Sequence, residues 1–203
     1  TEQKLDAAAH NLSKIRRNYA KRLETQIIEG LRDLNFLHVA FEISFEKTKS
    51  YTENGTDAVE FLISTNPGEA IRPLAKVVSG GELSRIMLAI KTILADRDET
   101  ETLIFDEIDA GVSGKTSEKI GVKLKEIGKS TQVFCVTHAA RIAALANRQY
   151  LIFKEEKDGR TETGLRELRG EERVEEIARI IGGIEITQKV RDTAREMLGK
   201  NRD

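Results

Sequence analysis

Apolar residues recur every three or four positions through the first 35 residues of the chain, which is the spacing of one face of an α-helix. Leu5, Leu12 and Tyr19 repeat every seven positions, as in the heptads of a coiled coil. After Tyr19 the apolar steps lengthen to four and leave this register. Residues 1–35 are therefore predicted to be either the end of a coiled coil or one long amphipathic surface helix.

Two stretches in which apolar and polar residues alternate follow this helical region. They span residues 37–46 and 59–63, and Asn54-Gly55 lies between them. Alternation with period two is typical of a strand with one buried face, and Asn-Gly is a strong hairpin-turn signal. We therefore expect a pair of antiparallel strands here, followed by a loop at Asn66-Pro67-Gly68.

From Gly81 onward, stripes of helical spacing alternate with short apolar runs. Helices are predicted over 81–94, 114–127 and 139–146, and strands over 102–105 and 132–136. This alternation indicates a parallel α/β sheet. The chain is predicted to end in a hairpin through Asp158-Gly159 and two helices around Gly182-Gly183. The expected fold class is α/β, a mainly parallel sheet flanked by helices, with antiparallel strands and an N-terminal helix.

Composition limits the classes of function. The 203 residues carry 33 basic and 34 acidic side chains, a net charge of −1, so any contact with DNA must come from a local patch. The single thiol, Cys135, excludes an internal disulfide framework and suits a reducing compartment, so we expect a cytoplasmic protein. No apolar run approaches the roughly 20 residues that span a bilayer, and we expect no membrane partner. Without an initiator Met or a signal peptide, the chain looks like a piece of something longer.

The first candidate site is Ser79-Gly80-Gly81-Glu82, at the start of a predicted helix. Ser79 and Glu82 have the spacing of a capping box, which by itself is a structural feature. The two glycines lower helix propensity by roughly 1 kcal/mol each. They also bring bare backbone N–H groups to the positive end of the helix dipole, where an anion can approach closely. The pattern favours a helix start that faces phosphate over plain capping.

Two further predicted strands end in polar residues. Asp106 and Glu107 follow the apolar run 103–105, and His138 follows the run 132–136. Residues at the carboxyl edge of a parallel sheet enter the ligand crevice. In phosphate-transfer ATPases an acid in the position of Asp106 supports Mg²⁺, and the following Glu can polarise water. An acidic strand end is common, and a lone His is usually a capping or core residue, so each signal is weak by itself.

The segment Ser113-Gly114-Lys115-Thr116 resembles the end of a phosphate-binding P-loop. That pattern requires Gly five positions before Gly114, and residue 109 is Asp. The full pattern occurs nowhere else in the chain. The main triphosphate cradle is therefore absent from these residues, and Lys115 is interpreted as part of a helix start.

Taken together, SGGE at 79–82, LIFDEID at 103–109, AGVSG at 110–114 and VTH at 136–138 resemble the signature motif, Walker B strand, D-loop and switch histidine of ABC-type ATPases. Glu82, where transporters usually carry Gln, resembles the SMC-related branch. Residues 59–69, 72–91 and 171–179 are similar to the bacterial RecN family of SMC-like proteins in DNA double-strand-break repair. In that branch a coiled coil separates an N-terminal lobe, which carries the Walker A loop, from a C-terminal lobe with the other motifs.

The resemblance implies a role for each matching residue. Asp106 would hold Mg²⁺, Glu107 would be the general base on the hydrolytic water, and His138 would sense or position the γ-phosphate. The signature residues would contact ATP bound chiefly by a second head, and Asp109 would lie at that dimer seam; the signature residues are Ser79, Gly80, Gly81 and Glu82. Residues 1–35 would end a coiled coil, and 36–203 would form the C-terminal lobe of the head.

The implied function is ATP hydrolysis on head dimerisation, with the chain alone inactive. The implied partners are the N-terminal lobe, a second head in a homodimer, and double-stranded DNA of the bacterial nucleoid. Two alternatives stay open: a cassette of an ABC transporter, which would carry its own P-loop, and a head that only dimerises or scaffolds. A basic cluster could meet DNA, although a solvated helix face is the commoner meaning; it comprises Lys14, Arg16, Arg17, Lys21 and Arg22.

Overall fold

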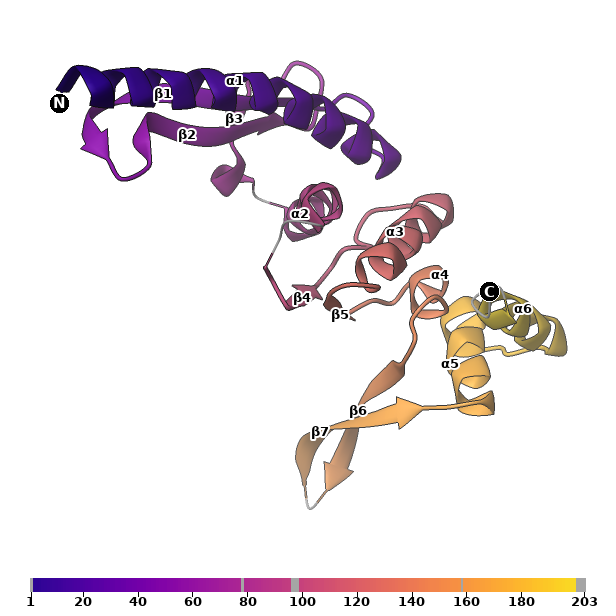
Figure 1. Ribbon diagram of the computed structural model, residues 1–203. Helices are drawn as coiled ribbons and strands as arrows, with labels where there is room; N and C mark the ends of the chain where they lie inside the picture. Colours follow the sequence, from indigo (N-terminus) through magenta and orange to yellow (C-terminus); the bar gives the residue numbers. More distant parts are fainter. Residues whose placement is uncertain (1, 78, 96–98, 158, 200–203) are drawn as a thin grey trace. The chain divides into compact units, whose positions relative to one another are not determined.

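The computed structural model describes residues 2–77, 79–95, 99–157 and 159–199 (Figure 1). They form two compact units, Thr1–Glu99 and Thr100–Asp203. None of the described helices combines the length and the apolar character that crossing a bilayer requires. The division at residue 35 between a coiled-coil end and a lobe stays a prediction.

The first unit combines two long helices with an antiparallel sheet in the order β1-β2-β3. Its elements are α1 (Glu2–Asp33), β1 (Ala40–Thr52), β2 (Gly55–Ser64), β3 (Arg72–Pro73), the 3₁₀ turn η1 (Leu74–Lys76) and α2 (Gly80–Leu94). The predicted pairing is confirmed, since the β1–β2 hairpin pairs from Ala40 opposite Ser64 to Thr52 opposite Gly55; its turn is formed by Glu53 and Asn54, and Gly55 already belongs to β2. Leu37 and Val39 precede β1, so the strand begins later than the alternation suggests.

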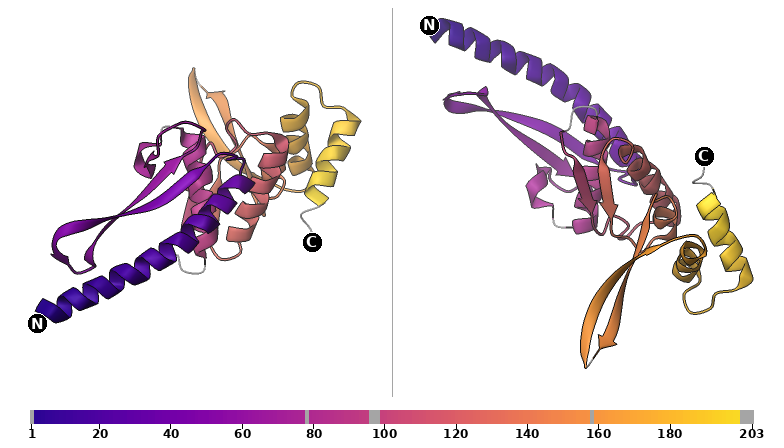
Figure 2. Two further views of the ribbon diagram at one scale, coloured as in Figure 1. Left: turned by 90° about the horizontal axis from the view of Figure 1, so that it is seen from above. Right: turned by 60° about the horizontal axis from the view of Figure 1, so that its bottom comes forward.

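Helix α1 covers the hairpin and lies beside it in both views of Figure 2. Ile27 and Leu31 of α1 are fully buried, and Phe41 and Ile43 of β1 are buried too. The Glu24 carboxylate of α1 accepts a hydrogen bond from the Ile43 N–H at 2.7 Å, which satisfies a strand-edge amide that would otherwise be unpaired. The sheet of this unit is thus covered by the chain's own helix.

The side chains at the heptad positions of α1 are exposed to solvent. Leu5 is 48% exposed and Tyr19 is 66% exposed. The basic side chains are partly used within the unit, because Arg16 pairs with Asp57 at 3.2 Å and Arg17 stacks on the Phe45 ring at 4.8 Å. The long helix itself is confirmed, and the choice between a coiled-coil end and a surface helix stays open.

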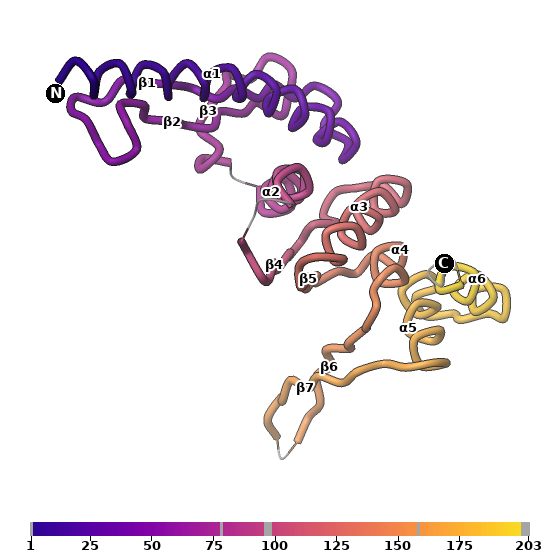
Figure 3. The backbone as a smooth tube through the Cα atoms, in the orientation of Figure 1, coloured from indigo at the N-terminus to yellow at the C-terminus, as the bar shows by residue number. Residues whose placement is uncertain are grey.

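The second unit begins with a strand, helix, strand segment that Figure 3 traces from β4 to β5. Its elements are β4 (Thr102–Phe105), α3 (Gly114–Ile127), β5 (Gln132–Cys135), α4 (Ala140–Ala143), β6 (Gln149–Lys157), β7 (Arg160–Leu168), α5 (Glu171–Gly182) and α6 (Gln188–Gly199). Strands β4 and β5 are parallel, whereas β6 and β7 form an antiparallel hairpin. The α/β class is confirmed, and within the described residues the parallel sheet has two strands.

Two details differ from the expected elements. Helix α4 covers only four residues, because the chain tightens at its end: the Leu145 N–H donates to the Ile142 carbonyl, three residues back, at 3.0 Å. The hairpin strands β6 and β7 are longer than the apolar pattern suggests. Asp158, one half of the expected turn, lies outside the described residues.

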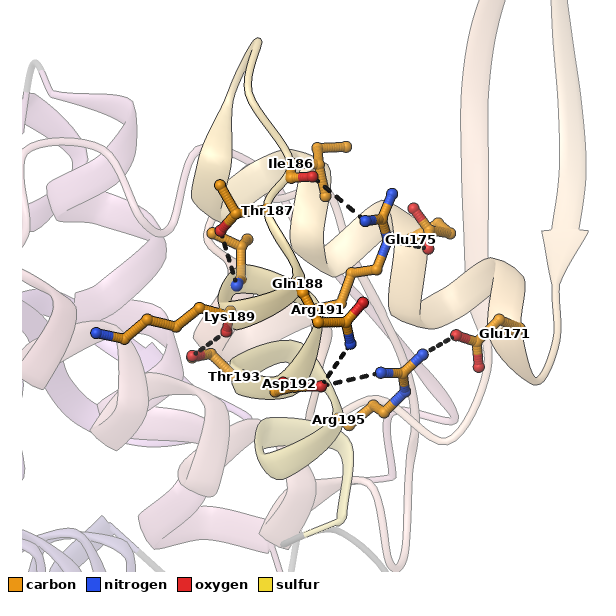
Figure 4. Close-up of polar contacts among 11 residues, drawn as sticks. Glu171, Glu175, Ile186, Thr187, Gln188, Lys189, Arg191, Asp192, Thr193 and Arg195 are labelled. Carbon is orange, nitrogen blue, oxygen red and sulfur yellow. Dashed lines mark hydrogen bonds and ion pairs between the residues drawn. The ribbon is translucent and has the colours of Figure 1, made fainter.

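Helices α5 and α6 pack as a pair at the end of the described chain. Their buried core contains Val174, Ile177, Ala178 and Ala194. Ion pairs cross the outside of this core, from Arg191 to Glu175 at 2.7 Å and from Arg195 to Glu171 (Figure 4). Because exposed ion pairs contribute little free energy, the apolar core accounts for most of the stability of this pair.

Candidate functional site

The parallel pairing of β4 and β5 brings two predicted site segments to one sheet edge. Phe105 lies opposite Cys135, and the Val136 N–H continues the ladder by donating to the Phe105 carbonyl at 2.9 Å. Both strands end within one residue of each other at this edge. Asp106 and the segment that contains His138 therefore leave the sheet side by side.

The carboxylates of Asp106 and Glu107 lie on the exposed side of the turn that follows β4. Glu107 has a φ of 54°, in the left-handed region that residues with a side chain seldom adopt. The Glu107 N–H donates to Asp106 Oδ1 at 2.8 Å, and the Ala110 N–H donates to the Glu107 carbonyl at 2.9 Å. Backbone strain of this kind is concentrated at functional sites. The turn presents two adjacent carboxylates to solvent.

Asp109 lies inside the same turn and is only 6% exposed. Its Oδ2 accepts hydrogen bonds from Thr137 Oγ1 at 2.6 Å and from the His138 N–H at 3.0 Å. The His138 ring is 85% exposed, with Nδ1 3.5 Å from the same Oδ2. Asp109 thus ties the two strand ends together. Its expected place at a dimer seam stays a prediction.

Thr137 lies in the candidate site, and the sequence patterns did not single it out. Besides donating to Asp109, its Oγ1 accepts from the Ala139 N–H at 3.0 Å. Its position directly before His138 was the only available signal, because the Asp109 contact joins residues 28 positions apart.

Cys135 and the segment around Lys115 are explained by the fold, as a largely buried thiol and the start of a helix. Burial, and then the negative charges of Asp109 and Asp106, raise the pKa of the Cys135 thiol to about 12, which favours the protonated thiol at neutral pH. Helix α3 begins at Gly114 with Ser113 as its N-cap residue, which agrees with interpreting Lys115 as part of a helix start.

In the first unit, the signature-like residues form the start of α2. Ser79 is the N-cap residue, and its Oγ accepts from the Glu82 N–H at 3.3 Å, which confirms half of the expected capping box. The Glu82 carboxylate accepts instead from Thr65 Oγ1 at 3.5 Å. Gly80 is exposed and Gly81 is buried in the first turn, where amides lack partners within the helix. Their own contacts with a nucleotide stay a prediction.

The described residues contain no group of three or more His, Cys, Asp or Glu side chains that could hold a metal ion. This is compatible with Mg²⁺, which commonly binds one or two carboxylates and completes its shell with water and substrate phosphates. The exposed Asp106 carboxylate fits such a partial site, since it needs no cage of protein ligands.

Comparison with known proteins gives the chain its family. No protein-family model matches it. It is 45% identical over 198 residues to the DNA repair protein RecN of Halalkalibacterium halodurans and 44% identical over 193 residues to that of Vibrio cholerae. These alignments cover 96% and 95% of this chain. By sequence, the chain belongs to the RecN family. It spans about a third of the RecN relatives, 35% of each.

The fold agrees with the RecN assignment. The Smc head domain with a coiled coil and joint from Pyrococcus yayanosii superposes with a TM-score of 0.52, over 93% of this chain and 30% of that one. The two are 16% identical, so the match concerns the fold alone. The RecN chain thus has the fold of part of an SMC-type head.

Proposed function

We propose that this chain is the C-terminal lobe of a RecN-type ATPase head, which hydrolyses ATP when two heads dimerise and serves DNA double-strand-break repair. The supporting observation is the single sheet edge at which β4 and β5 present Asp106, Glu107 and His138. The RecN relatives, named as DNA repair proteins, support the biological setting.

Each exposed group at this edge has a distinct task. Asp106 would hold Mg²⁺, which when bound neutralises phosphate charge and orients the substrate. Glu107 would accept a proton from the attacking water, and its backbone hydrogen bond to Asp106 holds it next to the metal-binding carboxylate. The exposed His138 ring would contact the γ-phosphate. Ser79, Gly80, Gly81 and Glu82 would bind the nucleotide of the second head through the start of α2.

The chain needs a partner that brings the Walker A loop, and an uncovered sheet face favours such a partner. One face of the β4–β5 sheet carries three exposed apolar side chains, Ile104 (72%), Phe134 (48%) and Val136 (51%). The RecN relatives are long enough to supply a cover, since this chain spans only 35% of them. We propose that the N-terminal lobe of the same protein packs on this face, and that the chain alone does not hydrolyse ATP.

Double-stranded DNA is the proposed macromolecular ligand, and the cytoplasmic nucleoid is the proposed location. Arg16 and Arg17 of the basic cluster on α1 already have intramolecular partners. Lys14, Lys21 and Arg22 are exposed and would carry the phosphate contacts. Neutralising these three should lower the salt dependence of DNA binding by the complete protein; an unchanged salt dependence would remove the patch from the proposal.

The hydrolytic role is tested with Glu107→Gln in the complete protein. We expect kcat for Mg-ATP to fall by about 100-fold to 10,000-fold, because the general base is lost, while ATP-bound dimers accumulate. Glu101→Gln is the matched control, since Glu101 is an exposed carboxylate just before the same strand. Turnover near the wild-type rate in Glu107→Gln would contradict the assignment.

A further inference from the structure

One buried carboxylate connects the two segments that carry the proposed chemistry. Asp109 Oδ2 accepts from Thr137 Oγ1 at 2.6 Å and from the His138 backbone N–H at 3.0 Å. Thr137 Oγ1 accepts from the Ala139 N–H at 3.0 Å, so its hydroxyl is used both as donor and as acceptor. This latch, formed by Asp109 and Thr137, lies within the unit Thr100–Asp203.

The latch lies close in the chain to both exposed groups, Glu107 and His138. Glu107 lies two residues before Asp109 in the same turn, which closes through the Ala110 N–H and the Glu107 carbonyl at 2.9 Å. His138 follows Thr137 directly, and its own backbone N–H is held by the latch. The ring nitrogen is 3.5 Å from Asp109, beyond good hydrogen-bonding distance, so the contact fixes the backbone of His138 and leaves its ring accessible.

We propose that Asp109 and Thr137 are positioning residues that keep Glu107 and His138 at a fixed separation. The inference rests on the proposed ATPase function, and it gives Asp109 an internal task, whereas the resemblance implies a place at the dimer seam. No described residue donates to Asp109 Oδ1, so the hydrogen bonds to Oδ2 are the ones that offset the cost of burying this polar side chain. Hydrogen bonds to a buried carboxylate are strong, and losing one donor should release the turn.

The kinetic test uses the complete protein with Thr137→Val, Thr137→Ser and the control Thr131→Val at the other end of β5. We expect Thr137→Val to lower kcat about tenfold, with KM for ATP and ATP-dependent dimerisation unchanged. Thr137→Ser keeps the hydroxyl and should stay within about twofold of the wild type. A loss that Thr137→Ser does not restore, or an equal loss in Thr131→Val, would overturn the proposal.

A double-mutant cycle separates the latch from a role at the dimer seam. Asp109→Ala and Thr137→Val should each lower kcat, and the double variant should lose no more than Asp109→Ala alone, because Asp109→Ala already removes the hydrogen bond that Thr137→Val removes. Additive losses would overturn the latch. Weakened dimerisation in Asp109→Ala, with normal dimerisation in Thr137→Val, would overturn it in favour of a seam contact.

Amide hydrogen exchange without nucleotide tests the latch independently of turnover. In the complete protein, Thr137→Val should speed exchange of residues 107–113 and of the His138 amide by about tenfold. Unchanged exchange would overturn the latch whatever the ATPase assay shows. Faster exchange in a protein whose wild type does not hydrolyse ATP would support the latch and contradict the proposed function.

Discussion

The two units of the chain differ in how far the apolar faces of their sheets are buried. In Thr1–Glu99, the apolar face of the β1–β2 hairpin is buried at Phe41, Ile43 and Ile63, and α1 supplies the cover. In Thr100–Asp203, one face of the β4–β5 sheet remains open, with Ile104 72% exposed. The β6–β7 hairpin is also open, since the cross-strand partners Ile152 and Leu165 are 60% and 65% exposed.

This difference indicates which unit the proposed N-terminal lobe would complete. A covered face contributes to stability within the chain, whereas an open apolar face does so only when a partner removes it from water. In the first unit, helix α1 covers the sheet. In the second unit, the candidate site lies at the edge of a sheet that has one exposed apolar face. The comparison supports a head that is completed by a separate lobe.

The largest expected effect is on the covered sheet. Ile27→Ala should lower the free energy of unfolding of the first unit by about 2–5 kcal/mol, because Ile27 is fully buried and its loss leaves a cavity. Ile104→Ala in the chain alone should cost less than about 0.5 kcal/mol. Denaturant unfolding measures both, and equal losses would show that the two sheets do not differ in this way.

The next effect is on association with the N-terminal lobe. Ile104→Asp should weaken binding of that lobe by about 10-fold to 100-fold, because it places a charge in an apolar contact. Ile184→Asp is the control, since Ile184 is completely exposed in the loop between α5 and α6. Isothermal titration calorimetry of the two pieces gives the affinities. Equal weakening by both variants would show that the open sheet face is not the binding site of the lobe.

The smallest effect concerns the contact of α1 with its hairpin at acid pH. Burial alone would raise the pKa of Asp57, but the Ser13 hydroxyl and the Arg16 guanidinium hold it below its usual 3.8. A carboxyl pKa that is lower in the folded state stabilises the fold above the unfolded pKa, and the gain is lost as the pH falls through the folded value.

Asp57→Asn should therefore flatten the fall in stability of the first unit below about pH 4. Urea unfolding at a series of pH values measures this slope. Glu42→Gln, which alters an exposed carboxylate of β1, is the control. An acid slope that Asp57→Asn leaves unchanged would show that the Asp57 contacts do not stabilise the covered sheet.

Local patterns predicted the elements that depend on neighbouring residues. Strand β4 and helix α3 have the predicted bounds, because an apolar run and a helical stripe are visible in the sequence. The pairing of β1 with β2 was visible in the alternation and in Asn54-Gly55. The acids and the histidine near the strand ends could be found for the same reason, since Asp106 and Glu107 directly follow β4 and His138 lies three residues after the end of β5.

Features that depend on distant residues could not be predicted. The sequence places Asp106, Glu107 and Asp109 within four positions, yet two of them are exposed and one is buried against Thr137. That outcome depends on how the turn packs after β4 and β5 pair. The left-handed φ of Glu107 could not be predicted either, because no sequence signal assigns a glutamate to a conformation that glycine prefers.

The most direct test of the central claim is Mg-ATP turnover by this chain mixed with its N-terminal lobe, with each piece alone as control and with linear duplex DNA added or withheld. We expect hydrolysis only in the mixture, and faster hydrolysis when DNA is present. Hydrolysis by this chain alone would contradict the claim that the main triphosphate-binding loop lies outside these residues. No hydrolysis in any mixture would favour a head that only dimerises or scaffolds.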